Sequence, residues 1–167
     1  MKYISLSARR KCKHSGKYFA IIDDDIFDEL SKYHWSISKN GYAQRRVKIG
    51  DKVSIIPMHR QIMNLTFGDK QCVDHINGNR LDNRKSNLRI CSRTENNHNM
   101  KLSKRNKSGA KGVYIQSKKI LRVSIMVNGK NIYLGTFLNA PEGFKQAKIA
   151  YNNAAIKYYG EFAYLNP

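Results

Sequence analysis

Features that would place this chain in a membrane or outside the cell are missing from its 167 residues. No apolar run approaches the ~20 residues that a membrane-spanning helix needs. The first nineteen residues, MKYISLSARRKCKHSGKYF, contain no apolar signal region, so nothing predicts export. The three cysteines, Cys12, Cys72 and Cys91, are odd in number and widely spaced, which does not suggest a disulfide framework and fits a reducing cytoplasm.

Acidic residues are also scarce. Twelve Asp and Glu stand against 31 Lys and Arg, which gives a formal net charge of +19. Between Glu95 and Glu142 there is no acidic residue, while lysines and arginines accumulate. A basic chain of this kind fits a polyanionic partner. Binding to a membrane surface would need a basic amphipathic helix, and none stands out. Nucleic acid is therefore the expected partner, and the alternative is a merely soluble basic protein.

The first half of the chain alternates short strands and short helices. Residues 18–22, YFAII, predict a buried strand, and residues 23–33 predict a helix that begins at an Asp triplet. Acidic residues complement the dipole at a helix start, so we interpret the triplet as a helix terminus rather than a metal site. Residues 41–60 predict two strands separated by a turn at Gly50-Asp51, and 58–68 predict a short helix ending near Gly68.

The second half begins with a basic, small-residue-rich stretch at residues 101–112, which predicts a linker or exposed loop. Three alternating strands follow, the last two joined by Asn128-Gly129, a strong two-residue hairpin sequence. A helix with Pro141 in its first turn and a capping-box spacing from Asn139 to Glu142 comes last. We expect an antiparallel sheet backed by this helix. The expected inner face comprises Val113, Ile115, Leu121, Val123, Ile125, Val127, Ile132 and Leu134.

Residues 73–100, VDHINGNRLDNRKSNLRICSRTENNHNM, are unusually rich in asparagine. Asp74 lies between Val73 and His75 as in a short strand, and Asn77-Gly78 is a hairpin-turn sequence. NLRI predicts a second strand, and the S-x-x-E spacing of SRTE predicts the start of a helix. The expected order is strand, polar loop, strand, helix.

This arrangement can build a nuclease site. Hydrolysis of a phosphodiester needs a base for the attacking water and a cation to offset charge on the phosphate. An Asp carboxylate and an Asn carbonyl are hard oxygen ligands suited to Mg²⁺ or Mn²⁺. A histidine with a pKa near its ordinary value of about 6.5 can act as a base at neutral pH.

The same stretch resembles the HNH endonucleases, particularly the phage and intron homing enzymes, whose fold is the ββα-metal finger. The resemblance implies that Asp74 and Asn96 bind one divalent cation, that His75 activates water, and that Asn87 anchors the loop. Asn97 or His98 could replace Asn96, because neighbouring helix positions differ by about 100°.

Two further expectations follow from this resemblance. PMHRQIM is similar to a segment upstream of the finger in this family, which gives His59 a lesser claim as a site residue. Some members of the family hold a structural zinc with two cysteine pairs. The chain has no C-x-x-C sequence, so we expect no structural zinc.

The C-terminal part, from about Lys111 to Asn166, resembles the plant ethylene-response-factor (APETALA-type) DNA-binding domain, most distinctively in YLGTF and the Ala-rich helix after it. That family lays the outer face of its sheet in the major groove. Several positions on that outer face are Arg or Trp in the plant proteins but not in this chain. We therefore do not expect this chain to recognise the DNA sequence that the plant proteins bind. The resemblance and the neighbouring basic residues predict DNA contacts from Lys111, Tyr114, Gln116, Lys118, Arg122, Ser124, Met126, Asn131 and Tyr133.

The predicted fold class is α+β, with a ββα-metal finger and a three-stranded antiparallel sheet packed on one helix. Residues 1–100 would form an N-terminal region and nuclease domain (finger about 72–100), 101–110 a basic linker, and 111–167 the DNA-binding domain. The predicted function is that of a divalent-metal-dependent DNA endonuclease of the homing type, phage-encoded and acting on double-stranded DNA in the cytoplasm of a bacterial host. The alternatives are a non-catalytic DNA-binding transcriptional regulator and an RNA-binding module.

Overall fold

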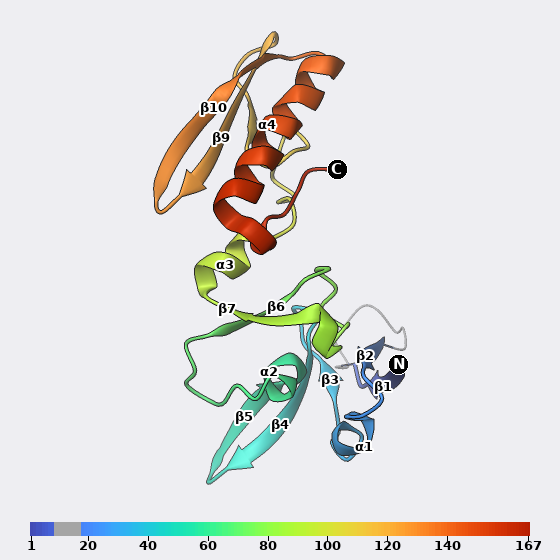
Figure 1. The fold of residues 1–167 in the computed structure, drawn as a ribbon. Coiled ribbons are helices and arrows are strands. Elements are labelled where there is room, and N and C mark those ends of the chain that lie inside the picture. Colours follow the sequence, from blue (N-terminus) through green and yellow to red (C-terminus); the bar gives the residue numbers. More distant parts are fainter. Residues whose placement is uncertain (9–17) are drawn as a thin grey trace. The chain divides into compact units, whose positions relative to one another are not determined.

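The computed structural model describes residues 1–8 and 18–167, so Cys12 and His14 lie outside the described residues. The chain divides into two compact units, Met1–Asn96 and Asn97–Pro167 (Figure 1). The first unit combines short helices with small antiparallel sheets, and the second combines one long helix with a three-stranded antiparallel sheet. Within the described residues, no helix combines the length and apolar character needed to cross a membrane.

The first unit begins with an antiparallel ribbon in which strand β1 (Lys2–Leu6) pairs with strand β2 (Tyr18–Ile22). The predicted strand at 18–22 is confirmed, and its alternate residues Ala20 and Ile22 are fully buried. Helix α1 (Phe27–Leu30) is a single turn inside the predicted range 23–33. Leu30 joins the core from this turn, so the short helix covers one edge of it.

A three-stranded sheet follows, with strand order β3-β4-β5. Strands β3 (Ser36–Ile37), β4 (Ala43–Ile49) and β5 (Lys52–Pro57) are antiparallel, and Gly50 in the predicted turn has a φ of 58°. Helix α2 (Met58–Ile62) starts where β5 ends. The prediction that this helix reaches Gly68 is wrong, because Asn64 adopts a left-handed φ of 55°, which is typical of a helix end.

Strand β6 (Cys72–His75) and strand β7 (Leu88–Cys91) pair antiparallel, and helix α3 (Arg93–His98) follows β7. The predicted order of strand, polar loop, strand and helix is therefore observed. Asn77-Gly78 does not join the strands as a two-residue hairpin. It closes a turn just after β6, where the Gly78 N–H donates to the His75 carbonyl oxygen at 2.8 Å. The short 3₁₀ helix η1 (Lys85–Asn87) ends the loop before β7.

The core of the first unit collects side chains from every element of that unit except β5, η1 and α3. Its largest fully buried side chain is Trp35, which is 1% exposed and whose Nε1 donates to the Leu30 carbonyl oxygen at 2.7 Å. The buried members of this core are Ile4, Leu6, Ala20, Ile22, Leu30, Trp35, Ile37, Ala43, Met58, Ile62, Val73 and Leu88. Val73 and Leu88 tie the β6–β7 pair to the rest of the unit, so the loop between these strands stands on a packed base.

In the second unit, strands β8 (Val113–Ile115), β9 (Ile120–Val127) and β10 (Lys130–Leu138) form an antiparallel sheet in the order β10-β9-β8. Asn128 and Gly129 have φ values of 49° and 76°, so the predicted two-residue hairpin is confirmed. Helix α4 (Pro141–Tyr159) packs on the sheet, and the 3₁₀ helix η2 (Gly160–Phe162) follows it.

Close approach of α4 to β8 explains one glycine in this unit. A Cβ atom on Gly112 would lie 2.0 Å from the ring of Tyr151 and 2.7 Å from the Ser124 carbonyl oxygen. No larger residue fits there without moving the helix. Ala110, which falls in the predicted linker, is fully buried in the same core, so the packed unit begins before Lys111.

Two sequence expectations for the second unit are wrong. Ile115, expected on the inner face, is 52% exposed, because β8 ends there and the helix does not cover it. Asn139 does not cap α4: the N-cap residue is Ala140, and the Asn139 side chain donates to the Lys118 carbonyl oxygen instead.

Candidate active site

Strand β6 ends with two buried polar side chains at adjacent positions. Asp74 is 6% exposed and His75 is 5% exposed. Asp74 Oδ2 accepts hydrogen bonds from Arg89 Nε at 3.0 Å and Arg89 Nη2 at 2.7 Å. Arg89 is the cross-strand partner of Asp74 on β7, so the register of the two strands creates this ion pair. A buried ion pair therefore lies directly beside a histidine.

His75 belongs to a cluster of three aromatic rings. The centroid of its imidazole lies 5.1 Å from that of His59 on α2, in an edge-on arrangement. The ring of Tyr42 lies 5.8 Å from His75 and 5.1 Å from His59. The guanidinium of Arg80, from the polar loop, lies 4.8 Å from the centre of the Tyr42 ring. His59, a lesser candidate in the sequence, is thus brought against His75.

Burial governs the charge of both histidines. It lowers the pKa of His75 from 6.5, while the hydrogen bond to Asn83 and the charges of Asp74 and Asp82 act in the opposite direction. Burial lowers the pKa of His59 to about 3, with smaller contributions from His75 and Arg60. Both imidazoles are therefore neutral near pH 7, and a neutral imidazole is the form that can accept a proton.

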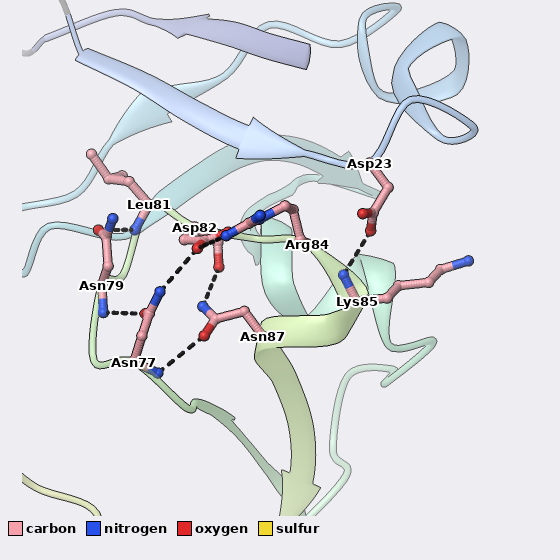
Figure 2. Close-up of polar contacts among 8 residues, drawn as sticks. All are labelled: Asp23, Asn77, Asn79, Leu81, Asp82, Arg84, Lys85 and Asn87. Atoms are coloured by element: carbon pink, nitrogen blue, oxygen red, sulfur yellow. Dashed lines mark hydrogen bonds and ion pairs between the residues drawn. The ribbon is translucent and has the colours of Figure 1, made fainter. Parts of the chain in front are cut away.

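The loop between β6 and β7 is held by its own polar side chains (Figure 2). Asn87 Oδ1 accepts from the Asn77 N–H at 3.0 Å, and Asn87 Nδ2 donates to the Asp82 carbonyl oxygen at 2.8 Å. The Asp82 carboxylate accepts from Asn77 Nδ2 at 2.9 Å and from two nitrogens of Arg84. Asn87 therefore joins the start, middle and end of the loop, which is the geometry expected of an anchor.

The same loop is fastened to the N-terminal ribbon. The Ile21 N–H donates to the Leu81 carbonyl oxygen, and the Asn83 N–H donates to the Ile21 carbonyl oxygen, both at 2.8 Å. A carboxylate oxygen of Asp23, just after β2, accepts from the Lys85 N–H at 2.7 Å (Figure 2). Strand β2 thus supports the loop by backbone pairing, although it contributes no predicted site residue.

Sequence reasoning missed three residues of this site: Tyr42, Asp82 and Asn83. Asp82 and Asn83 are 2% and 0% exposed, although they stand in the middle of a polar loop. The sequence offered one indication that Asp82 and Asn83 are buried. The preceding residue, Leu81, is apolar, and in the structure it is half-buried against the core. Tyr42 lies more than thirty residues from His75 in the sequence, and no local pattern connects them.

Helix α3 is fixed at its start by the predicted capping box. Glu95 Oε2 accepts from the Ser92 N–H at 2.7 Å, and Ser92 Oγ accepts from the Glu95 N–H at 3.2 Å. Burial raises the pKa of the Cys91 thiol to about 11, and the nearby carboxylates of Asp74 and Glu95 add to this effect. Asp74 and Glu95, which lies in the first turn of α3, are therefore both close enough to the Cys91 thiol to raise its pKa.

The three candidate helix ligands have different surroundings. Asn96 is half-buried, and its N–H donates to the Ser92 carbonyl oxygen at 3.1 Å. Asn97 is exposed. The ring of His98 stacks on Tyr159, with centroids 3.6 Å apart and planes inclined by 10°. Stacking on one ring face does not block the in-plane nitrogens of an imidazole, so Asn96, Asn97 and His98 all stay candidates for the helix ligand.

The donor set suits a hard cation with few protein ligands. Among the described residues, no group of three or more His, Cys, Asp and Glu side chains could hold a metal ion. Mg²⁺ needs no such cage, because it keeps several waters and is held by one or two oxygen ligands together with substrate phosphate. Asp74 and Asn96 supply such oxygens. A cation at Asp74 would share or replace the ion pair with Arg89.

Most side chains of the predicted DNA-contacting set are exposed, and their contact with DNA stays a prediction. Arg122 and Tyr133 interact with each other, with the guanidinium 5.5 Å from the ring centre. Exposed members of the predicted set are Tyr114, Gln116, Lys118, Arg122, Met126, Asn131 and Tyr133.

Two members of that set are placed differently. Ser124 is only 2% exposed, so its prediction as an outward contact is wrong: it lies on the central strand, and its short side chain sits opposite Tyr133. Lys111 is half-buried, and its Nζ donates to the carbonyl oxygens of His98 at 2.9 Å and Met100 at 2.8 Å. Burial lowers its pKa to about 8. Lys111 therefore stabilises the chain after α3 in this structure.

Known proteins are similar to this chain in the segment that holds the candidate site and beyond it. A family model described as HNH endonuclease matches residues 57–98, which include His59, Asp74, His75, Asn87 and Asn96. A relative from Acanthamoeba polyphaga mimivirus, described as uncharacterized HNH endonuclease L560, is 32% identical over 149 residues, covering 87% of this chain and 73% of the relative. The solved structure of the HNH homing endonuclease I-HmuI, described as showing DNA binding and cleavage, is 23% identical with a TM-score of 0.36. That match covers 60% of each chain.

Proposed function

Because the chain belongs to the HNH endonuclease family, we propose that it is a divalent-metal-dependent enzyme that hydrolyses phosphodiester bonds of double-stranded DNA. The observation that carries this proposal is the Asp74–His75 pair at the end of β6. His75 is neutral, and Asp74 is a buried carboxylate of the type that binds a hard cation. Both residues lie in the segment that matches the family model.

In the proposed reaction, His75 takes the proton from the water that attacks the phosphorus. Such general-base assistance contributes typically 10²- to 10⁴-fold to the rate. Asn87 keeps the loop closed around this histidine through its bonds to Asn77 and Asp82. Asp74 and Asn96 would hold the cation. When bound, a divalent cation offsets negative charge on the phosphate and on the leaving oxygen.

We further propose that the second unit delivers the nuclease to DNA. The support is its exposed outer sheet face and the absence of acidic residues between Glu95 and Glu142 in the sequence. A sheet face of this size can enter the major groove, with Arg122 and Lys118 contacting bases or phosphates. The resemblance to ethylene-response-factor domains supports the same placement. Recognition of a particular DNA sequence by this face would restrict cleavage to one site, which is the behaviour of a homing enzyme.

The experiment is an incubation of the full chain with plasmid and phage genomic DNA, with and without Mg²⁺ or Mn²⁺. We expect cleavage that EDTA abolishes and that added Mg²⁺ or Mn²⁺ restores. Full activity in excess chelator would contradict the metal assignment. Tight binding without cleavage under any cation would favour the non-catalytic regulator, and a preference for RNA over duplex DNA would favour the RNA-binding module.

A further inference from the structure

Asn83 is a fully buried amide that faces the imidazole of His75. Its exposed fraction is 0%, and its Oδ1 lies 3.4 Å from His75 Nε2. Its Nδ2 has no hydrogen-bond partner within the part of the chain that the structure describes. An amide oxygen can only accept a hydrogen bond, so this contact requires the proton of the neutral imidazole to be on Nε2. The Asn83 side chain therefore contacts His75 through its oxygen and not through its amino group.

The backbone of Asn83 is held in place from two sides. Its N–H donates to the Ile21 carbonyl oxygen of β2 at 2.8 Å, and Ile21 forms a parallel bridge with Asp82. On the other side, Asn87 Nδ2 bonds to the Asp82 carbonyl oxygen. A side chain on so restrained a backbone has little freedom to turn away from His75. The N-terminal ribbon thereby acts on the imidazole through the loop.

The other neighbours of the imidazole provide packing of a different kind. The rings of His59 and Tyr42 lie against it at centroid distances of 5.1 and 5.8 Å. Both are ring contacts, and among the described residues His59 Nδ1 has no hydrogen-bond partner. These rings restrict where the imidazole lies, but they do not choose between its two protonated forms. That choice needs an acceptor such as the Asn83 oxygen.

We propose that Asn83 is a positioning residue that fixes the tautomer and orientation of His75 by accepting its Nε2–H. The unprotonated Nδ1 is then the nitrogen that takes the proton from the attacking water. This inference rests on the proposed role of His75 as the base. A base whose tautomer is set by a third group is a general arrangement in enzymes, and the wrong tautomer can cost as much as about 10⁴-fold in kcat.

The direct test is ¹⁵N NMR of the metal-free full chain with labelled histidine, at a pH where the imidazoles are neutral. Two-bond ¹⁵N–¹H correlations show which ring nitrogen carries the proton, and loss of the signal in His75→Gln identifies His75. We expect protonation at Nε2 in the wild-type protein. Protonation at Nδ1 in the wild type would overturn the proposal without the need for any variant at Asn83.

Two substitutions of similar size separate positioning from packing. Asn83→Leu keeps the volume and removes the acceptor, whereas Asn83→Asp keeps an acceptor oxygen and removes only the unpartnered amino group. If Asn83 positions His75, the Leu variant loses the single Nε2–H tautomer, and its kcat falls about 10²-fold or more with KM near the wild-type value. The Asp variant keeps the tautomer and most of the cleavage.

A purely structural role predicts the opposite order, because leucine suits a buried site and an added carboxylate does not. Full cleavage by a folded Asn83→Leu protein, or an unchanged His75 tautomer in it, would overturn the proposal. If the Leu variant did not fold, the wild-type tautomer and the Asp variant would still decide. The NMR measurement needs no substrate, so a wild-type chain that failed to cut DNA would contradict the proposed function alone.

Discussion

His59 illustrates how burial can dominate the charge of a single residue. It is 9% exposed, it lies between Met58 and Arg60 at the start of α2, and burial lowers its pKa to about 3. Its Nδ1 has no partner within the described residues, so protonation of this ring would place a charge in an enclosed site. His59 is thus suited to pack against His75 and poorly suited to replace it as the base.

This leads to a prediction for stability against pH. Below about pH 6.5 the unfolded chain binds a proton at His59 that the folded chain does not bind until the pH approaches 3. The free energy of unfolding should therefore fall as the pH drops from about 6.5 towards 3, by up to about 1.4 kcal/mol per pH unit from this group. Urea unfolding at several pH values measures the slope.

His59→Phe should reduce that slope, because phenylalanine keeps an aromatic ring in the cluster and takes up no proton. The same replacement of the exposed His34 is the control for the loss of a histidine outside the ring cluster. Equal slopes in the wild type and His59→Phe would show that the folded chain protonates His59 as readily as the unfolded chain does.

The sequence revealed the candidate residues that stand in one continuous motif. Asp74, His75, Asn87 and Asn96 follow a fixed spacing, so no knowledge of the fold was needed to propose them, and their roles stay predictions. Asn83 could not be found in this way, because its importance comes from contacts with Ile21 and His75 that only the folded chain creates. The burial of Ser124 likewise depends on neighbouring strands.

At the scale of elements, α3 is a six-residue helix with no buried side chain of its own. Isolated helices of this length are unstable, so α3 depends on local stabilisation. The capping box between Ser92 and Glu95 satisfies two N–H groups at its start. Because Asn96 lies one position beyond Glu95, the same capping box fixes the proposed metal ligand.

We predict that Ser92→Ala destabilises the start of α3 by about 1 kcal/mol, the typical loss for an N-cap residue. Thermal unfolding should shift down by about 4–8 °C if the first unit unfolds as one domain. Calorimetric titration with Mn²⁺ should show weaker binding, because Asn96 is held less firmly. Ser5→Ala, at an exposed position of β1, is the matched control. Unchanged stability and metal affinity in Ser92→Ala would mean that the capping box is dispensable.

Local sequence rules predicted elements well where backbone chemistry decides them. The Asn128-Gly129 turn and the Ser92–Glu95 capping box are confirmed because each depends on a few adjacent residues. The end of α2 and the start of α4 were misplaced. At both helix ends, hydrogen bonds with residues outside the helix compete with the local sequence pattern. Arg60 bonds to carbonyl oxygens of the loop after α2, and Asn139 bonds to the Lys118 carbonyl oxygen.

At the scale of the whole molecule, the chain consists of two units with separate cores. The second core is made by residues between Ala110 and Ala163, and the hydrogen bonds of Asn166 with Lys111 and Asn152 close its end. No residue from the first unit belongs to this core within the described residues. The second unit therefore has the features of an independently folding domain.

We predict that a fragment Asn97–Pro167 folds alone, binds duplex DNA and does not cut it. Its affinity should fall steeply with salt, since each neutralised phosphate adds about −0.9 to the slope of log K against log salt concentration. Circular dichroism and gel shifts at several salt concentrations measure both properties. An unfolded fragment, or one without affinity for DNA, would contradict the role of this unit in delivering the nuclease to its substrate.

The central claim is that His75 is the catalytic base and Asp74 a metal ligand of a DNA nuclease. The most direct measurement compares wild type, His75→Ala and Asp74→Ala in plasmid nicking, DNA gel shifts and Mn²⁺ titration. We expect His75→Ala to lose cleavage by 10²- to 10⁴-fold while DNA and metal binding stay near wild type. Asp74→Ala should lose cleavage and metal affinity together. Cleavage by His75→Ala at the wild-type rate would contradict the account.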